Sequence, residues 1–149
     1  MINVEPHPDF PNIDLLEHAA RVTLEHQSDD PDVDLSIVLT DDDQLRALNR
    51  DYLGIDSPTD VLSFPASESD PETGARYLGD ILISIPRAAE QANAAGHDIQ
   101  EEVQLLVVHG VLHLLGHDHA EAEEKARMWA AQAEVLERLG LGHIKVREE

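Results

Sequence analysis

The sequence contains no cysteine among its 149 residues, which excludes disulfide bonds and thiolate metal ligands. Aromatic residues make up only 3% of the chain, so any hydrophobic core must consist mainly of aliphatic side chains. No apolar run approaches the roughly 20 residues of a membrane-spanning helix, and the N-terminal MINVEPHPDF lacks the features of a signal peptide. These absences predict a cytoplasmic protein without a membrane partner, organised as one domain over residues 1–149.

Basic residues are scarce as well. The chain has 10 Lys and Arg residues against 31 Asp and Glu residues, a formal net charge of −21, and its only lysines are Lys125 and Lys145. Such a surface repels a polyanion at long range, so the composition predicts no DNA partner and little non-specific binding of nucleic acid. Two explanations of the acidic surface remain open, namely solubility in a salty cytoplasm, which we favour, and docking of a basic protein.

Hydrophobic periodicity predicts both strands and helices. We expect strands at residues 1–5, 33–40, 60–65 and 77–84. We expect helices at residues 13–27, about 41–52, 85–95, 98–115 and about 121–139. A polar stretch at residues 67–75 is expected to form an exposed loop. This order predicts an α+β fold in which a small mixed sheet of about four strands packs with about five helices.

Capping signals support three of the expected helix starts. Thr40 is expected to cap the helix that begins in the acidic run DDD. Ser84 is a good N-cap for the helix that follows it, because a proline stands two residues later. Asp98 and Glu101 have the spacing of a capping box at the start of the next helix.

Four histidines fall within the eleven residues HGVLHLLGHDH, at positions 109–119. His109 and His113 are four residues apart in an expected helix, so both rings leave the same face. Gly116 allows a sharp turn, after which His119 can return over that face. Three neutral imidazoles in this arrangement suit one tetrahedral Zn²⁺ per chain with an open position, at the end of a long helix. Three nitrogen ligands also suit other borderline metals.

The same histidine spacing occurs in the zinc-protease motif H-E-x-x-H-x-x-G-x-x-H. Gly110 stands where that motif has the glutamate that acts as general base, so we do not expect proteolysis. His117 is expected to be a neighbour of the metal site rather than a ligand. Asp118 can accept a proton from the second nitrogen of a ligand, or cap the next helix. Five scattered histidines are expected at the surface: His7, His18, His26, His97 and His143.

Three segments together resemble a known family. The stretch HGVLHLLGHDH, with PTDVLSFP at 58–65 and LGDILIS at 78–84, is similar to the YbeY family of bacterial metal-dependent endoribonucleases. The resemblance implies the small α+β fold of the family, zinc bound by His109, His113 and His119, and a cleft for single-stranded RNA. It implies a single-strand-specific endoribonuclease of late ribosomal RNA processing, including maturation of the small-subunit 3′ end, and a role in ribosome assembly and quality control.

The resemblance also assigns candidate substrate-binding residues. The family usually has an arginine just before the glycine of the loop that precedes PTDVLSFP, and this chain has Leu53 there. Arg50, one helical turn earlier, is a candidate to replace that arginine. Thr59, Asp60 and Ser63 are expected to orient the pocket through hydrogen bonds, although turn formation and strand termination explain the same residues.

The general base is not identified by the motifs. Asp80, His117 and Asp118 are candidates to transfer protons during RNA cleavage. An alternative function is a non-catalytic, zinc-stabilised ribosome-assembly factor that binds ribosomal proteins or other assembly factors, and the loss of the arginine at Leu53 favours it. A metalloprotease-like hydrolase is a third hypothesis, which Gly110 disfavours.

Overall fold

The computed structural model describes residues 2–10, 12–27, 33–56, 59–69, 72, 76–117 and 121–144. Within these ranges the elements are β1 (Ile2–Glu5), α1 (Ile13–Gln27), β2 (Val33–Thr40), α2 (Asp42–Leu53), β3 (Val61–Ser69), β4 (Arg76–Ser84), α3 (Ile85–Ala95), α4 (Ile99–Leu114) and α5 (Ala122–Arg138). None of the helices in this part of the chain has the length and apolar content needed to span a lipid bilayer.

The strands form one mixed sheet in the order β1-β2-β4-β3. The pairs β1–β2 and β2–β4 are parallel, and β3 is antiparallel to β4, with Ser63 opposite Ile81 and Phe64 opposite Asp80. The expected α+β class, with a mixed sheet of four strands and five helices in the described ranges, is therefore confirmed.

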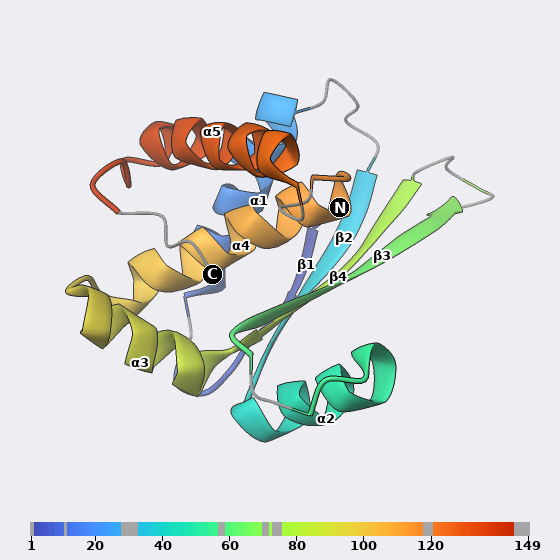
Figure 1. Cartoon of the computed structure of the whole chain (residues 1–149), viewed down its shortest axis with the longest axis vertical. Helices are drawn as coiled ribbons and strands as arrows, with labels where there is room; N and C mark the ends of the chain where they lie inside the picture. Colours follow the sequence, from blue (N-terminus) through green and yellow to red (C-terminus); the bar gives the residue numbers. More distant parts are fainter. Residues whose placement is uncertain are drawn as a thin grey trace.

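The two faces of the sheet pack against different helices (Figure 1). Alternating residues of β4 separate the two layers, because successive side chains of a strand point to opposite faces. Ile81 and Ile83 belong to the main core beneath α4, whereas Leu82 packs with Leu45 and Leu62 in a smaller core beneath α2. Helix α4 is apolar and buried along nearly its whole length, between β4, α1, α3 and α5. The helix that carries His109 and His113 is thus the central helix of the fold.

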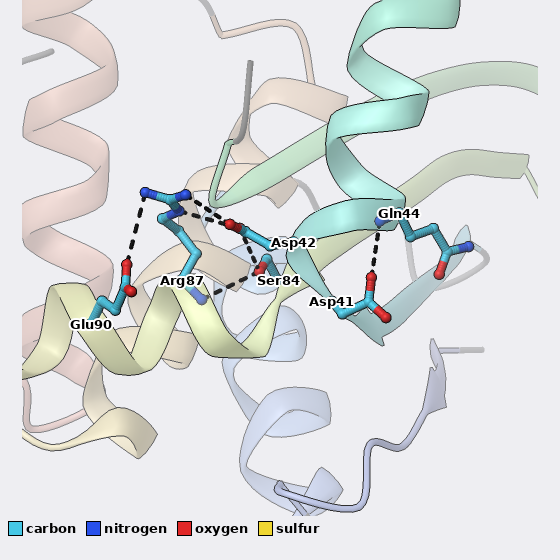
Figure 2. Close-up of polar contacts among 6 residues, drawn as sticks. All are labelled: Asp41, Asp42, Gln44, Ser84, Arg87 and Glu90. Atoms are coloured by element: carbon cyan, nitrogen blue, oxygen red, sulfur yellow. Dashed lines mark hydrogen bonds and ion pairs between the residues drawn. The ribbon is translucent and has the colours of Figure 1, made fainter. Parts of the chain in front are cut away.

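A network of polar contacts joins α2, α3 and the end of β4 (Figure 2). Arg87 donates from Nε and Nη2 to the two carboxylate oxygens of Asp42, at 3.2 and 2.7 Å. The hydroxyl of Ser84 also donates to Asp42, at 3.1 Å, and the amide of Ser84 donates to the carbonyl of Asp60, at 3.0 Å. The Arg87 guanidinium holds the pKa of Asp42 below its usual value. The contact with Asp60 holds the residue that immediately precedes β3.

The helix caps agree with the sequence at two of three positions. Ser84 caps α3, and Asp98 with Glu101 forms a complete capping box on α4. The prediction of Thr40 as a cap was wrong, because Thr40 is the last residue of β2 and Asp41 caps α2, accepting from the Gln44 amide at 2.9 Å. Both Thr40 and Asp41 are favoured N-cap residue types. Because Thr40 pairs with Ser84 of β4 as part of the sheet, Asp41 becomes the N-cap of α2.

The expected loop at 67–75 was partly wrong. Strand β3 continues to Ser69, where the backbones of residues 68 and 69 pair with Tyr77 and Arg76 of β4. The extension is irregular, with a register shift between Pro65 and residue 68. Polar residues of this kind have no strong strand preference of their own, so the hydrogen bonds offered by β4 extend the strand.

Candidate active site

His109 and His113 leave α4 on the same side and their rings approach edge to face. The ring centroids are 4.6 Å apart with an interplanar angle of 76°, and the two Nε2 atoms are 3.1 Å apart. Two ligands of one tetrahedral zinc, each with a Zn–N bond of about 2.0–2.1 Å, have their nitrogens roughly 3.3 Å apart. The two imidazoles are therefore placed as two ligands of a single metal ion require, which is what the one-turn spacing predicts.

His119 and Asp118 lie outside the described residues. Among the residues that are described, no group of three or more histidine and carboxylate side chains is arranged to hold a metal. The nitrogen donors of His109 and His113 fit zinc or another borderline divalent ion in their chemistry and spacing, and the complete ligand set remains a prediction.

The two histidines line a cavity of about 350 Å³. Its wall is built from α4, the start of β3, the end of α2 and one face of α5. Polar groups come from both histidines and from PTDVLSFP, and Leu105 and Leu106 of α4 add apolar surface. A concave site with a few polar groups on an apolar lining is the usual form of a small-ligand or substrate site.

Six residues of PTDVLSFP line this cavity, and the three substrate-binding candidates are among them: Thr59, Asp60 and Ser63. Asp60 is buried, with 9% of its surface exposed. The Ser63 hydroxyl lies 3.4 Å from the carbonyl of Gly110, so a weak hydrogen bond connects β3 with the histidine helix. The Thr59 hydroxyl lies equally far from the carbonyl of Val61. The fold thus brings these residues to the histidines across a separation of about fifty positions.

Arg50 and Leu53 have different relations to the cavity. Leu53, at the end of α2, lines it and is 57% exposed. Arg50 is not among the residues that line it, and its guanidinium pairs with Asp51 at 3.1 Å. Tyr52 and Ile55, close to Leu53 in the chain, are also large hydrophobic residues with exposed side chains.

Two of the proposed proton-transfer candidates lie away from the histidine pair. Asp80 is adjacent in β4 to Ile81, which faces α4, so Asp80 points to the other face of the sheet, where the Tyr77 hydroxyl donates to it. His117 lies 2.6 Å from Gln27 of α1 through its Nε2. Burial, followed by the charges of Arg127 and His26, lowers the pKa of His117.

Gly110 has a packing role that the motif did not reveal. A Cβ at this position would lie 2.8 Å from Cγ2 of Ile81, much closer than a van der Waals contact. Gly110 therefore lets α4 approach the sheet closely. A glutamate here would point into the sheet rather than toward the cavity, so the position cannot supply the general base of a zinc protease.

Two scattered histidines are less exposed than expected. His97 has a side chain only 10% exposed, and its Nε2 lies 2.7 Å from the carboxylate of Glu102, which is fully buried at the start of α4. His26 is 13% exposed and lies 2.8 Å from the carboxylate of Glu134. Both were predicted as surface residues, and the prediction was wrong because acidic partners from other turns or helices cover them.

Helix α5 contributes two residues that were not predicted. His109 Nδ1 lies 2.9 Å from Oε1 of Gln132, and the ring of Trp129 is 5.8 Å from the His109 ring. Both residues line the cavity. One signal in the sequence pointed to Gln132, because it shares the apolar face of α5 with Met128 and Leu136. A polar residue in such a stripe needs a buried partner.

Comparisons with known proteins agree with the motifs. The family model described as Endoribonuclease YbeY matches residues 6–140. The chain is 44% identical to Endoribonuclease YbeY of Persephonella marina over 125 residues, covering 83% of this chain and 81% of the relative. It is 48% identical to the Endoribonuclease YbeY of Geobacillus kaustophilus over 134 residues, covering 85% and 83%. A solution structure of a Thermotoga maritima protein is similar in fold, with a TM-score of 0.62, 28% identity and coverage of 93% and 89%.

Proposed function

Because the chain belongs to the Endoribonuclease YbeY family, we propose that it is a zinc-dependent endoribonuclease specific for single-stranded RNA. The family confirms the class of enzyme expected from the motifs, an RNA-cleaving hydrolase. The observation that carries the zinc assignment is the pair of Nε2 atoms 3.1 Å apart in a cavity lined by residues of PTDVLSFP. His109 and His113 would hold the ion together with His119, one Zn²⁺ per chain.

The proposed metal defines the chemistry of the cavity. Zinc bound by histidines polarises a phosphoryl oxygen and makes a nucleophile available near neutral pH. His109 and His113 supply two nitrogens on a rigid, buried helix, so little reorganisation is needed to bind the ion. Thr59, Asp60 and Ser63 line the wall beside them and are proposed to orient the substrate through hydrogen bonds. Asp118 is a candidate for moving the proton.

The size of the cavity supports a single-stranded substrate. Its volume of about 350 Å³ lies near the lower limit of small-ligand sites. A single nucleotide of an unpaired strand can enter such a space. The nucleotides of an RNA duplex are held in the helix, which offers only a wide and shallow groove at its surface and is too large to enter the cavity. Phosphodiester cleavage beside the histidines therefore requires that the RNA present a flexible, unpaired segment.

We assign the biological role from the family resemblance. The proposed substrate is ribosomal RNA in the late steps of its processing, including the 3′ end of the small-subunit RNA, in the cytoplasm. Ribosomal proteins or assembly factors are proposed partners in ribosome assembly and quality control. The net charge of −21 repels the phosphates of RNA outside the cavity and attracts basic ribosomal proteins.

The test is a cleavage assay on defined RNA. Purified protein, either zinc-loaded or treated with chelator, is mixed with a single-stranded fragment that spans the small-subunit 3′ end and with a duplex of the same sequence. We expect cleavage of the single strand by the zinc-loaded protein only, and its loss in His113→Ala. His18→Ala is the matched control, because His18 is exposed on α1 and does not line the cavity. Cleavage that persists without zinc or without His113 would refute the proposal.

One observation favours the alternative of a non-catalytic assembly factor. Leu53 lines the cavity in the place where an arginine is expected, so a cation that could neutralise phosphate is missing there. Leu53→Arg tests this alternative, because the added charge is expected to raise the cleavage rate if the chain is a nuclease. If the chain only binds ribosomal proteins, neither the parent nor Leu53→Arg cleaves RNA, and both retain a ribosomal protein in a pull-down.

A further inference from the structure

We propose that Gln132 is a positioning residue that sets the tautomer of His109 and so prepares its Nε2 for the metal. This inference deepens the proposed function and rests on it for the presence of a metal at the histidine pair. The evidence is the contact of His109 with α5, which joins two residues 23 positions apart.

The contact determines where the proton of His109 lies. The amide oxygen of Gln132 is only an acceptor, so His109 Nδ1 must carry the hydrogen in the 2.9 Å bond. A neutral imidazole carries one hydrogen, so Nε2 then keeps its lone pair. That Nε2 is the atom that faces the Nε2 of His113 at 3.1 Å. The hydrogen bond that His109 donates to Gln132 therefore leaves the lone pair on His109 Nε2, the nitrogen that lies beside His113 Nε2.

The surroundings of Gln132 show that its amide is placed for a partner. The residue is 2% exposed, and it is the single polar residue among the buried positions of α5. Burying an amide without a hydrogen bond costs free energy, so an apolar residue would fit this stripe better if packing were the only requirement. Metal-binding histidines characteristically donate their second N–H to a carbonyl or carboxylate, which fixes the ring and raises the basicity of the ligand nitrogen.

The molecule carries its own reporter beside this contact. Trp129 is the only tryptophan in the chain, and its ring lies 5.8 Å from the His109 ring. A paramagnetic ion such as Co²⁺ bound at His109 is expected to quench its fluorescence. Metal affinity can thus be measured on the protein alone, without RNA and without any cleavage assay.

Three variants separate positioning from packing. Gln132→Leu keeps a similar volume but removes the acceptor, Gln132→Glu keeps an acceptor, and Gln104→Leu is the matched control. Gln104 is a buried glutamine of α4, 7% exposed, whose side chain donates to the backbone of Gln100 rather than to a histidine. We expect Gln132→Leu to weaken Co²⁺ and Zn²⁺ binding roughly 10- to 100-fold. Gln132→Glu is expected to bind at least as tightly as the parent, and Gln104→Leu to match it.

Nitrogen-15 NMR of the metal-free protein provides a second measurement that a purely structural role would not change. We expect His109 of the parent protein to carry its proton on Nδ1, and His109 of Gln132→Leu to shift toward the tautomer with the proton on Nε2. A proton on Nε2 of His109 in the parent overturns the proposal even if no variant folds. Unchanged affinity or an unchanged tautomer in a folded Gln132→Leu protein also overturns it.

Failure of the proposed function is distinguishable from failure of this inference. If the parent protein binds no metal, or cleaves RNA without metal, the proposal of a zinc-dependent nuclease is refuted. The proposed tautomer of His109 is not affected by that result, because it is measured in the metal-free protein. A parent that binds one metal ion and cleaves RNA, with a Gln132→Leu variant of equal affinity, refutes the role of Gln132 alone.

Discussion

Replacing Gly110 with alanine tests how closely α4 packs on the sheet. In an ordinary helix interior this substitution stabilises by about 1 kcal/mol, because glycine is a poor helix former. Here the new Cβ would lie 2.8 Å from Cγ2 of Ile81, 3.1 Å from its Cδ1 and 3.2 Å from its Cγ1. Ile81 is fully buried in β4 and cannot swing into solvent.

The expected magnitude follows from two opposing terms. Inserting a methyl group into a filled core costs about 1–3 kcal/mol, and the gain in helix propensity offsets about 1 kcal/mol of it. We therefore expect Gly110→Ala to lower the free energy of unfolding by about 1 kcal/mol. Gly110→Glu is expected to cost more, because it also buries a carboxylate against the sheet.

A double-mutant cycle isolates the contact. Ile81→Ala removes all three atoms that the new Cβ would meet, and by itself costs about 2–5 kcal/mol. In that background Gly110→Ala is expected to stabilise by about 1 kcal/mol, since only the helix propensity term remains. Unfolding in urea, followed by circular dichroism, gives the four free energies. A substitution at Gly110 that stabilises the parent, or has the same effect in both backgrounds, would refute the packing argument.

Three further predictions concern charge and metal. Asp42→Asn should lower the free energy of unfolding at pH 7 by about 1 kcal/mol, a value limited because the carboxylate is one-third exposed. Arg87 lowers the pKa of Asp42 in the folded protein below 3.8, so this stabilisation is complete above that pH and is lost as the pH falls through the folded pKa. Urea unfolding curves of the parent and the variant should therefore converge in acid. His97→Ala should cost about 2 kcal/mol in the same melts by removing a partner of buried Glu102, whereas exposed His18→Ala should cost little. Zinc at 100 times its dissociation constant should stabilise the parent by about 2.7 kcal/mol, measured as a higher melting temperature that chelator reverses and His113→Ala abolishes.

Much of the fold and one part of the candidate site could be predicted from the sequence, because the signals are local. The capping box at Asp98 and Glu101 needs only backbone within one helical turn, and it forms as expected. The one-turn spacing of His109 and His113 places both rings on one face of any helix, and their Nε2 atoms do meet at 3.1 Å. The alternation of Val33–Thr40 likewise predicts a strand with one buried face.

Tertiary structure alone decided the rest, because the partners are distant in the chain. Strand β3 reaches Ser69 only because β4 lies beside it and pairs with its backbone. Asp80 faces away from the histidines because the side of β4 that meets α4 is set by packing of Ile81 under Gly110. Gln132 reaches His109 because α5 folds back along α4. Periodicity within one element identifies which residues are buried, but which elements meet depends on how all of the buried faces pack together.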